Sequence, residues 1–141
     1  MARVGCEAAS DELSHASHAC HAPQGHAFLR HVERCAALLL VVDLGAGAHE
    51  RAGEPPVTQL RMLRAELAAY DASLLERPAL VVGTKLDLPG AATALAGLRR
   101  SATATGKPRP LGVSAATGEG VEELRAAVSS LSEHAQRLRV M

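Results

Sequence analysis

The chain contains no isoleucine, asparagine or tryptophan, and it has one phenylalanine and one tyrosine among its 141 residues. It also has no excess of charge, since 15 lysines and arginines are matched by 15 aspartates and glutamates. A neutral chain without a basic run lacks the electrostatic footprint of non-specific nucleic-acid binding. The apolar run from Ala36 to Val42 is far shorter than the ~20 residues of a membrane-spanning helix. These absences exclude non-specific nucleic-acid binding and a transmembrane helix.

Cysteine is scarce, and its three copies, Cys6, Cys20 and Cys35, all lie in the first quarter of the chain. No secretory signal precedes them, so we expect free thiols in a reducing compartment and no disulfide framework. Histidines accompany these cysteines, but their spacing does not match the C-x2-C or H-x3-H pairs of zinc sites. We interpret residues 1–24 as a weakly structured leader without metal ligands, with zinc binding by this leader as the alternative.

Apolar runs at residues 37–44, 79–83 and 111–114 are typical of short strands buried on both faces. Apolar residues at helical spacing predict helices over residues 26–35, 57–70, 91–100 and from 119 onward, with loops at 45–56 and 103–110. Strands that alternate with helices in this way predict an α/β fold of three parallel strands with flanking helices.

Two of these helices carry an apolar stripe that we expect to face the core. The stripes are Leu60, Leu63, Leu67 and Tyr70 in the first, and Val121, Leu124, Val128 and Leu131 in the last. Glu119, Glu122 and Glu123 are expected in the first turn of the last helix, where the helix dipole favours negative charge.

Polar residues follow each predicted strand, at the edge of a parallel sheet where ligands bind. They are Asp43, the segment Thr84–Asp87 and the segment Ser114–Ala116. The Asp87 carboxylate can accept two parallel hydrogen bonds from adjacent N–H groups, which guanine presents and adenine does not. The stem of Lys85 can lie along the face of a base, and a backbone N–H near Ser114 can donate to a base carbonyl. These groups predict a guanine-reading pocket, and the alternative is solvated loop residues beside a turn hydroxyl.

The stretches VVGTKLDLPG and LGVSAATGEGVEEL resemble the guanine-specificity motif Asn-Lys-x-Asp and the Ser-Ala motif of translation-factor-related GTPases. The stretches GHAFLRHVERCAALLLVVDL and EPPVTQLRMLRAELAAYDASLLERPALVV resemble the Obg family of ribosome-assembly GTPases, and are nearest its mitochondrial members. The resemblance covers residues 25–131 and is to the C-terminal half of a G domain of the P-loop NTPase type. It divides the chain into the leader, residues 1–24, and a half G domain, residues 25–141.

The resemblance implies that the chain binds GTP and GDP through the guanine base. The base-binding residues that it implies are Thr84, Lys85, Asp87, Ser114 and Ala115, with Thr84 in place of the family's Asn. Full-length members of the family hydrolyse GTP with Mg²⁺ and assist assembly of the large ribosomal subunit. A mitochondrial location follows from the same resemblance, with the cytoplasm as the alternative.

Three motifs of the family are missing from the sequence, namely the phosphate loop G-x-x-x-x-G-K-S/T, the switch I threonine and the switch II Asp-x-Pro-Gly. We therefore expect a truncated chain that is not catalytic alone, with no catalytic residue and no Mg²⁺ ligand of its own. The missing half would pair beside residues 37–44, so this apolar strand is expected to form an open sheet edge that favours self-association. The alternative function is a noncatalytic interaction module that binds ribosomal or GTPase partners.

Overall fold

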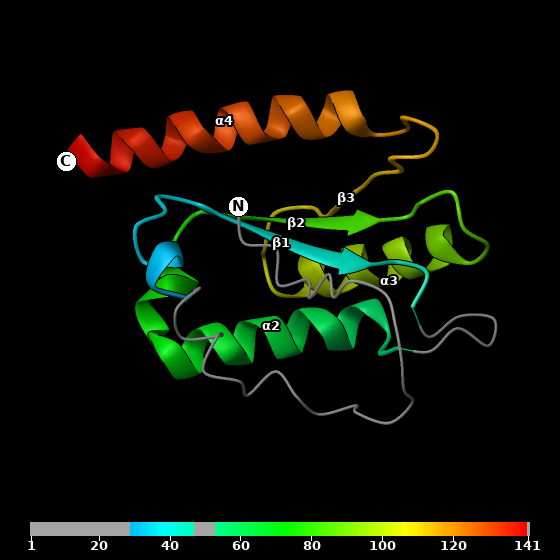
Figure 1. Cartoon of the computed structure of the whole chain (residues 1–141), viewed down its shortest axis with the longest axis horizontal. Coiled ribbons are helices and arrows are strands. Elements are labelled where there is room, and N and C mark those ends of the chain that lie inside the picture. The colour runs from blue at the N-terminus through cyan, green and yellow to red at the C-terminus, as the bar shows by residue number, and fades with distance from the viewer. Residues whose placement is uncertain (1–28, 47–52, 141) are drawn as a thin grey trace, which may run out of the picture.

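The structure of the chain is a computed structural model, and it describes residues 29–46 and 53–140. Its centre is a parallel sheet in the order β1-β2-β3 (Figure 1), made of β1 (Leu38–Asp43), β2 (Ala79–Thr84) and β3 (Leu111–Gly112). β1 pairs with β2 from Leu38↔Ala79 to Asp43↔Thr84, whereas β2 pairs with β3 only at Val82↔Leu111 and Gly83↔Gly112. The predicted α/β class with three parallel strands is confirmed.

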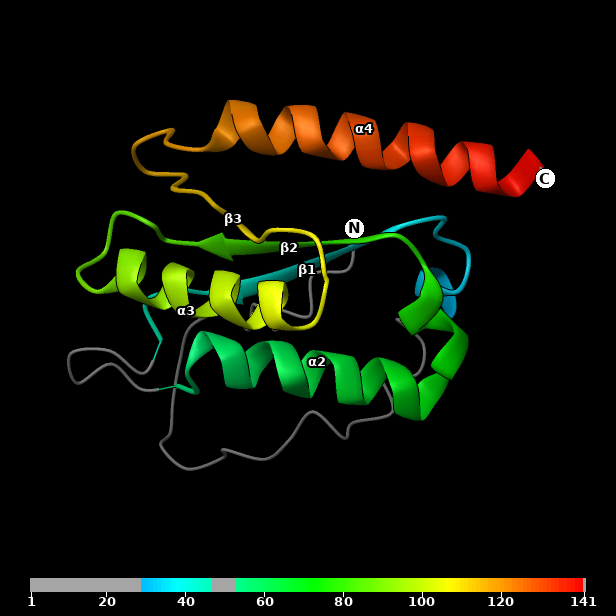
Figure 2. The same ribbon diagram turned by 180° about the vertical axis from the view of Figure 1, so that it is seen from behind.

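Helices cover both faces of this sheet. The opposite views in Figures 1 and 2 show α2 (Pro56–Tyr70) and α3 (Ala91–Ala104) on one face and α4 (Val121–Val140) on the other. A short 3-10 helix, η1 (Ala72–Glu76), follows α2, and residues 29–32 are also helical. Because the three strands run in the same direction, the turns that follow them meet at one edge of the sheet.

Each face of the sheet has its own hydrophobic core. On the face of α2 and α3, the cluster includes Leu38, Leu40, Val42, Leu60, Leu67, Leu74, Leu95 and Leu98. On the face of α4, Leu80, Val82, Leu111 and Val113 form a smaller cluster, against which Leu124, Ala127 and Leu131 pack. The predicted stripe of α2 is confirmed, since Leu60 and Leu67 are buried while Leu63 and Tyr70 pack against the larger core. Each fully buried leucine contributes roughly 1.5–3 kcal/mol of transfer free energy.

The predicted apolar face of α4 is half wrong. Leu124 and Leu131 pack against the smaller core as expected, but Val121 and Val128 are each 41% exposed. The buried side of the helix is a narrow stripe that continues to Ala135, which is only 2% exposed. A small sheet accepts only such a stripe, so the two valines on its flank remain in solvent.

α3 is longer and β3 is shorter than the sequence predicts. Residues 101–104 continue the helix, although Ser101 and Thr103 have low helix propensity and residues 103 and 104 were expected in a loop. The helix stops because Gly106 adopts a left-handed φ of 63° and Lys107 N–H donates to Ala102 O at 2.9 Å. β3 was expected over 111–114, but only two of its residues pair with β2.

The link from α2 to β2 contains η1, which the sequence analysis did not predict. Asp71 is the N-cap of η1, and its carboxylate accepts hydrogen bonds from Ser73 Oγ at 2.8 Å and from Ser73 N–H at 2.9 Å. These two hydrogen bonds hold the pKa of Asp71 below its ordinary value.

β1 lies at the edge of the sheet, and one side chain protects its last residue. Leu38 N–H donates to Pro78 O and Leu44 N–H donates to Thr84 O. The backbone N–H and C=O groups of the even-numbered residues of β1 therefore point toward β2. The amide of Gln59 replaces a neighbouring strand at Asp43, because it accepts from Asp43 N–H at 2.9 Å and donates to Asp43 O at 3.0 Å. The open edge that the sequence predicts is thus present in the described part of the chain, at Leu39 and Val41.

Other predictions concern residues that the structure does not describe. The leader, residues 1–24, and the start of the helix predicted over 26–35 lie outside the described ranges. Within those ranges, no helix combines the length and the apolar character needed to cross a lipid bilayer. Cys35, which is described, is a free thiol.

Candidate functional site

Two side chains meet at the carboxyl edge of the sheet, where β1 and β2 end. Lys85 follows β2 and adopts a left-handed φ of 62°, which residues with a Cβ rarely adopt. Its Nζ lies 2.5 Å from Asp43 Oδ2, and the two side chains are 55% and 33% exposed. Thr84 Oγ1 donates to Val42 O at 3.2 Å, so this hydroxyl joins the ends of the two strands. The sequence brought Asp43 and Lys85 to one edge, and the structure pairs them.

Asp87 and Ser114 come from different loops and are joined by a hydrogen bond. Ser114 Oγ donates to Asp87 Oδ1 at 2.5 Å and accepts from Thr117 N–H at 3.2 Å. Leu86 N–H donates to Val113 O at 3.0 Å and ties the two loops together immediately before this contact. Ser114 is fully buried whereas Asp87 is exposed. A buried hydroxyl therefore orients a carboxylate that otherwise faces solvent.

The loop from Ser114 to Gly120 is held by its own backbone. Ser114 N–H donates to Glu119 O and Gly118 N–H donates to Ser114 O, both at 2.9 Å. Gly120 ends the loop with a φ of 73°, so close to β3 that a Cβ there would lie 2.1 Å from Gly112 O. The loop exposes Ala115, whose backbone N–H has no acceptor among the described residues.

The sequence analysis missed two residues that support this site, Gln59 and Gly120. Gln59 is 16 residues from Asp43, and no local pattern marks it as the partner of that backbone. Gly120 had a weak signal, since it is the second glycine of Thr-Gly-Glu-Gly immediately before a helix. Its role depends on the approach of Gly112, which only the packed structure reveals.

The loops that follow β2 and β3 carry three groups with the chemistry to contact a flat polar ring. The Asp87 carboxylate can accept from two adjacent N–H groups, the Ala115 N–H can donate, and the Lys85 stem supplies an apolar surface. One edge of guanine presents two adjacent N–H donors and a carbonyl, which are the chemical complements of these acceptors and this donor. The sequence has no phosphate loop, and the described ranges contain no group of three side chains that could hold a metal ion.

Replacing Lys85 tests the backbone conformation that positions it. Lys85→Ala and Lys85→Gly both remove the ion pair with Asp43, but only glycine relieves the left-handed backbone, which is unfavourable by about 1–2 kcal/mol for other residues. Glycine also loses about 0.5–1 kcal/mol more conformational entropy on folding. We therefore expect the free energy of unfolding in urea to be about 0.5–1 kcal/mol higher for Lys85→Gly than for Lys85→Ala. A lower value for the glycine variant would contradict the left-handed conformation.

About three quarters of the chain aligns with curated proteins called GTPase Obg. Identity is 44% over 105 residues with the protein of Anaeromyxobacter dehalogenans strain 2CP-C and 46% over 101 residues with that of Desulforudis audaxviator. These alignments cover 74% and 71% of this chain. The chain is also 40% identical, over 109 residues or 77% of its length, to the protein of Oryza sativa subsp. japonica called "Probable GTP-binding protein OBGM, mitochondrial".

These relatives are much longer than the chain. The chain spans 29% of the Anaeromyxobacter protein, 22% of the Desulforudis protein and 20% of the rice protein. No protein-family model matches the chain. The similarity therefore shows common descent with one part of these proteins.

Proposed function

We propose that guanine-nucleotide binding is the function of this chain, which over about three quarters of its length belongs to the Obg family of GTPases. The observation that carries the proposal is the 2.5 Å hydrogen bond from Ser114 Oγ to Asp87 Oδ1. It connects the two loops and gives the exposed carboxylate of Asp87 a fixed orientation. The names of the relatives, which include GTPase and GTP-binding, support the same ligand.

Each candidate residue has a distinct role in the proposed complex. Asp87 accepts hydrogen bonds from the two adjacent N–H groups of guanine, and the Ala115 N–H donates to the base carbonyl. Lys85 covers one face of the base with its stem, while Thr84 and Ser114 position the loops. Adenine has no ring N–H beside its amino group, so it would leave the Asp87 carboxylate only partly paired. A site that hydrogen-bonds its ligand discriminates against an analogue that leaves a polar group of the site unpaired, so the Asp87 carboxylate would favour guanine over adenine.

Hydrolysis of GTP is not part of the proposal for this chain alone. Phosphoryl transfer depends on positioned phosphates, metal and water, and the sequence has no phosphate loop to hold them. Contacts to the base alone are expected to give a Kd on the order of millimolar. A titration that shows tight, Mg²⁺-dependent binding of GTP would contradict this expectation.

A ¹⁵N–¹H correlation spectrum of the purified chain, titrated with GDP and separately with ADP, tests the proposal. We expect GDP alone to shift the amide peaks of Lys85, Asp87 and Ala115. The variant Asp87→Asn should lose these shifts, because its side chain replaces one of the two acceptor oxygens by a donor. Asp71→Asn is the matched control, since Asp71 is a loop carboxylate that contacts Ser73 and should leave GDP binding unchanged. Equal shifts with ADP, or unchanged binding by Asp87→Asn, would overturn guanine recognition.

A second candidate function is a noncatalytic interaction module, and the open edge of β1 favours it. Such a module would bind ribosomal or GTPase partners by strand pairing or through its helices. The large ribosomal subunit is the partner that the Obg resemblance implies. Binding that needs no guanine nucleotide and tolerates Asp87→Ala would support the module over the nucleotide-binding protein.

The compartment is part of the same proposal. The name of the rice relative places that protein in mitochondria, whereas the Anaeromyxobacter and Desulforudis relatives are bacterial. We infer a mitochondrial location for this chain from the rice similarity. Fractionation of cells that express the tagged chain tests it, and recovery in the cytosol would contradict it.

A further inference from the structure

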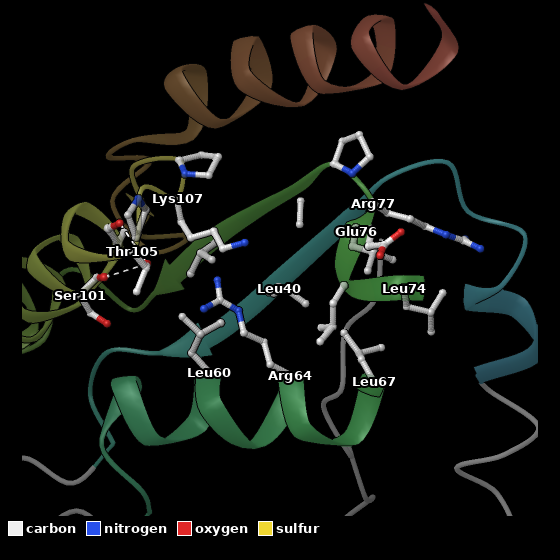
Figure 3. A pocket seen from close by; sticks show the side chains of 18 residues that line it. Leu40, Leu60, Arg64, Leu67, Leu74, Glu76, Arg77, Ser101, Thr105 and Lys107 are labelled. Atoms are coloured by element: carbon white, nitrogen blue, oxygen red, sulfur yellow. Dashed lines mark hydrogen bonds between the residues drawn. The ribbon is translucent and has the colours of Figure 1, made fainter. Parts of the chain in front are cut away.

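A pocket lies near the amino ends of the strands, whereas the candidate base site lies near their carboxyl ends. Its volume is about 390 Å³, and it is bounded by α2, η1, the C-terminal part of α3 and the loop that leads to β3 (Figure 3). Pro78 and Pro110, which precede β2 and β3, line it, so it opens at the amino ends of the strands. The volume falls within the roughly 300–1,000 Å³ that is usual for small-molecule sites.

The floor of this pocket is apolar. It is formed by Leu38 and Leu40 of β1, Leu60 and Leu67 of α2, and Val81 of β2. These side chains belong to the larger core and are almost fully buried. An apolar group that entered between α2 and the sheet would therefore meet a continuous hydrocarbon surface.

Two cationic side chains reach over this floor from opposite sides. Figure 3 shows Arg64 rising from α2 and Lys107 extending from the loop after α3 into the same space. Neither side chain makes an ion pair or a hydrogen bond in the described part of the chain. Arg77 also lines the pocket, but its Nη1 already donates to Val32 O at 3.1 Å and to Cys35 O at 2.5 Å. Glu76 is the one acidic residue of the lining.

We propose that this pocket binds a small carboxylate with an apolar hydrocarbon body. The apolar body lies against the leucines of the floor, and the carboxylate lies between Arg64 and Lys107. The planar fork of Arg64 suits a carboxylate, which it can contact through two N–H groups. Lys107 adds a second positive charge that the described part of the chain leaves without an anion. None of the residues that line this pocket belongs to the proposed base site, which lies at the carboxyl ends of the strands.

Octanoate is the probe that tests this pocket. We expect titration of the full chain with octanoate to shift amide peaks of α2, of residues 101–107 and of Ala79, with saturation in the millimolar range that suits so small a ligand. Octanol has the same hydrocarbon body without the charge and should bind about tenfold more weakly, because it forgoes the charge-assisted hydrogen bonds. Octylammonium should not bind, since its charge matches that of Arg64 and Lys107. Equal binding of octanol and octanoate, or no saturable shift with octanoate, would overturn the proposal.

Two variants locate the carboxylate. Arg64→Gln and Lys107→Gln should each weaken octanoate binding about tenfold. Arg61→Gln and Arg100→Gln are matched controls, because these arginines lie on α2 and α3 as exposed residues that do not line the pocket. Octanoate binding should also be the same with and without GDP, which keeps its outcome separate from that of guanine binding. Equal effects of all four substitutions would reduce the role of Arg64 and Lys107 to general surface charge and overturn the proposed pose.

Discussion

Gly120→Ala is expected to lower the free energy of unfolding by about 4 kcal/mol or more, a size that single substitutions reach only by a specific clash or strain. A Cβ at this position would lie 2.1 Å from Gly112 O and 3.2 Å from Gly112 C. Both are backbone atoms of β3, so no rotamer change can relieve the contact. The φ of 73° adds the left-handed penalty of about 1–2 kcal/mol that any residue with a Cβ meets.

Gly118→Ala is the matched control, because it separates the clash from the backbone conformation. Gly118 has a φ of 80°, but a Cβ there would have no atom within 4 Å. Only the left-handed penalty applies, and it is partly offset because alanine loses about 0.5–1 kcal/mol less conformational entropy than glycine on folding, so we expect a loss of about 0.5–1 kcal/mol in parallel urea denaturations. If Gly120→Ala were as stable as Gly118→Ala, the close approach of Gly120 to β3 would be wrong.

The same substitution also reaches the candidate base site. Gly120 follows the loop in which Ser114 N–H donates to Glu119 O, and the buried Ser114 hydroxyl orients Asp87. Moving Gly120 away from β3 would pull this loop from Asp87. We therefore expect Gly120→Ala to lose the GDP-dependent peak shifts even under conditions where it still folds, and Gly118→Ala to keep them.

The parallel sheet and the edge that carries polar residues could be predicted from the sequence for a simple reason. The apolar runs at 37–44 and 79–83 predict buried strands. The carboxyl ends of parallel strands lie at the same end of the sheet. The 2.5 Å contacts of Lys85 with Asp43 and of Ser114 with Asp87 confirm that these residues are neighbours. Their part in binding guanine stays a prediction.

The details that could not be predicted depend on partners far away in the sequence. Val121 and Val128 match the helical spacing of Leu124 and Leu131, yet they are exposed because the area of the sheet beneath α4, and not the spacing, decides which residues are covered. Likewise, no sequence pattern around Gln59 predicts its contact with the backbone of Asp43. Periodicity describes one element at a time, whereas these contacts arise between elements.

Thr84, which stands in place of the family's Asn, makes a hydrogen bond of its own within the fold. The family motif has Asn at this position, and the sequence analysis placed Thr84 among the base-binding residues. Its hydroxyl is committed to Val42 O, which joins the ends of β1 and β2. Thr84 can therefore hold the loop that presents Lys85 and Asp87 without touching the base itself.

The chain is expected to self-associate through β1, with a molecular mass that rises with concentration in sedimentation experiments. The even-numbered residues of β1 face β2, so the N–H and C=O groups of Leu39 and Val41 point to the open side. An antiparallel, two-fold pairing of two copies would let Leu39 of one copy exchange both hydrogen bonds with Val41 of the other. Between Leu38 and Val42 the strand carries no charged residue and no proline, which are usual protections of an exposed edge.

Val41→Lys should abolish this association, since a lysine on an edge strand opposes pairing by charge repulsion and by the loss of apolar contact. Val57→Lys is the matched control, because Val57 is an exposed valine of α2, 44% accessible, and is not part of the β1 strand. Amide hydrogen exchange gives a second readout. In dilute solution Leu39 and Val41 should exchange faster than Leu40 and Val42, and the difference should shrink as concentration rises. A wild-type chain that stays monomeric at high concentration, or a Val41→Lys variant that associates as the wild type does, would show that the edge of β1 is not where copies meet.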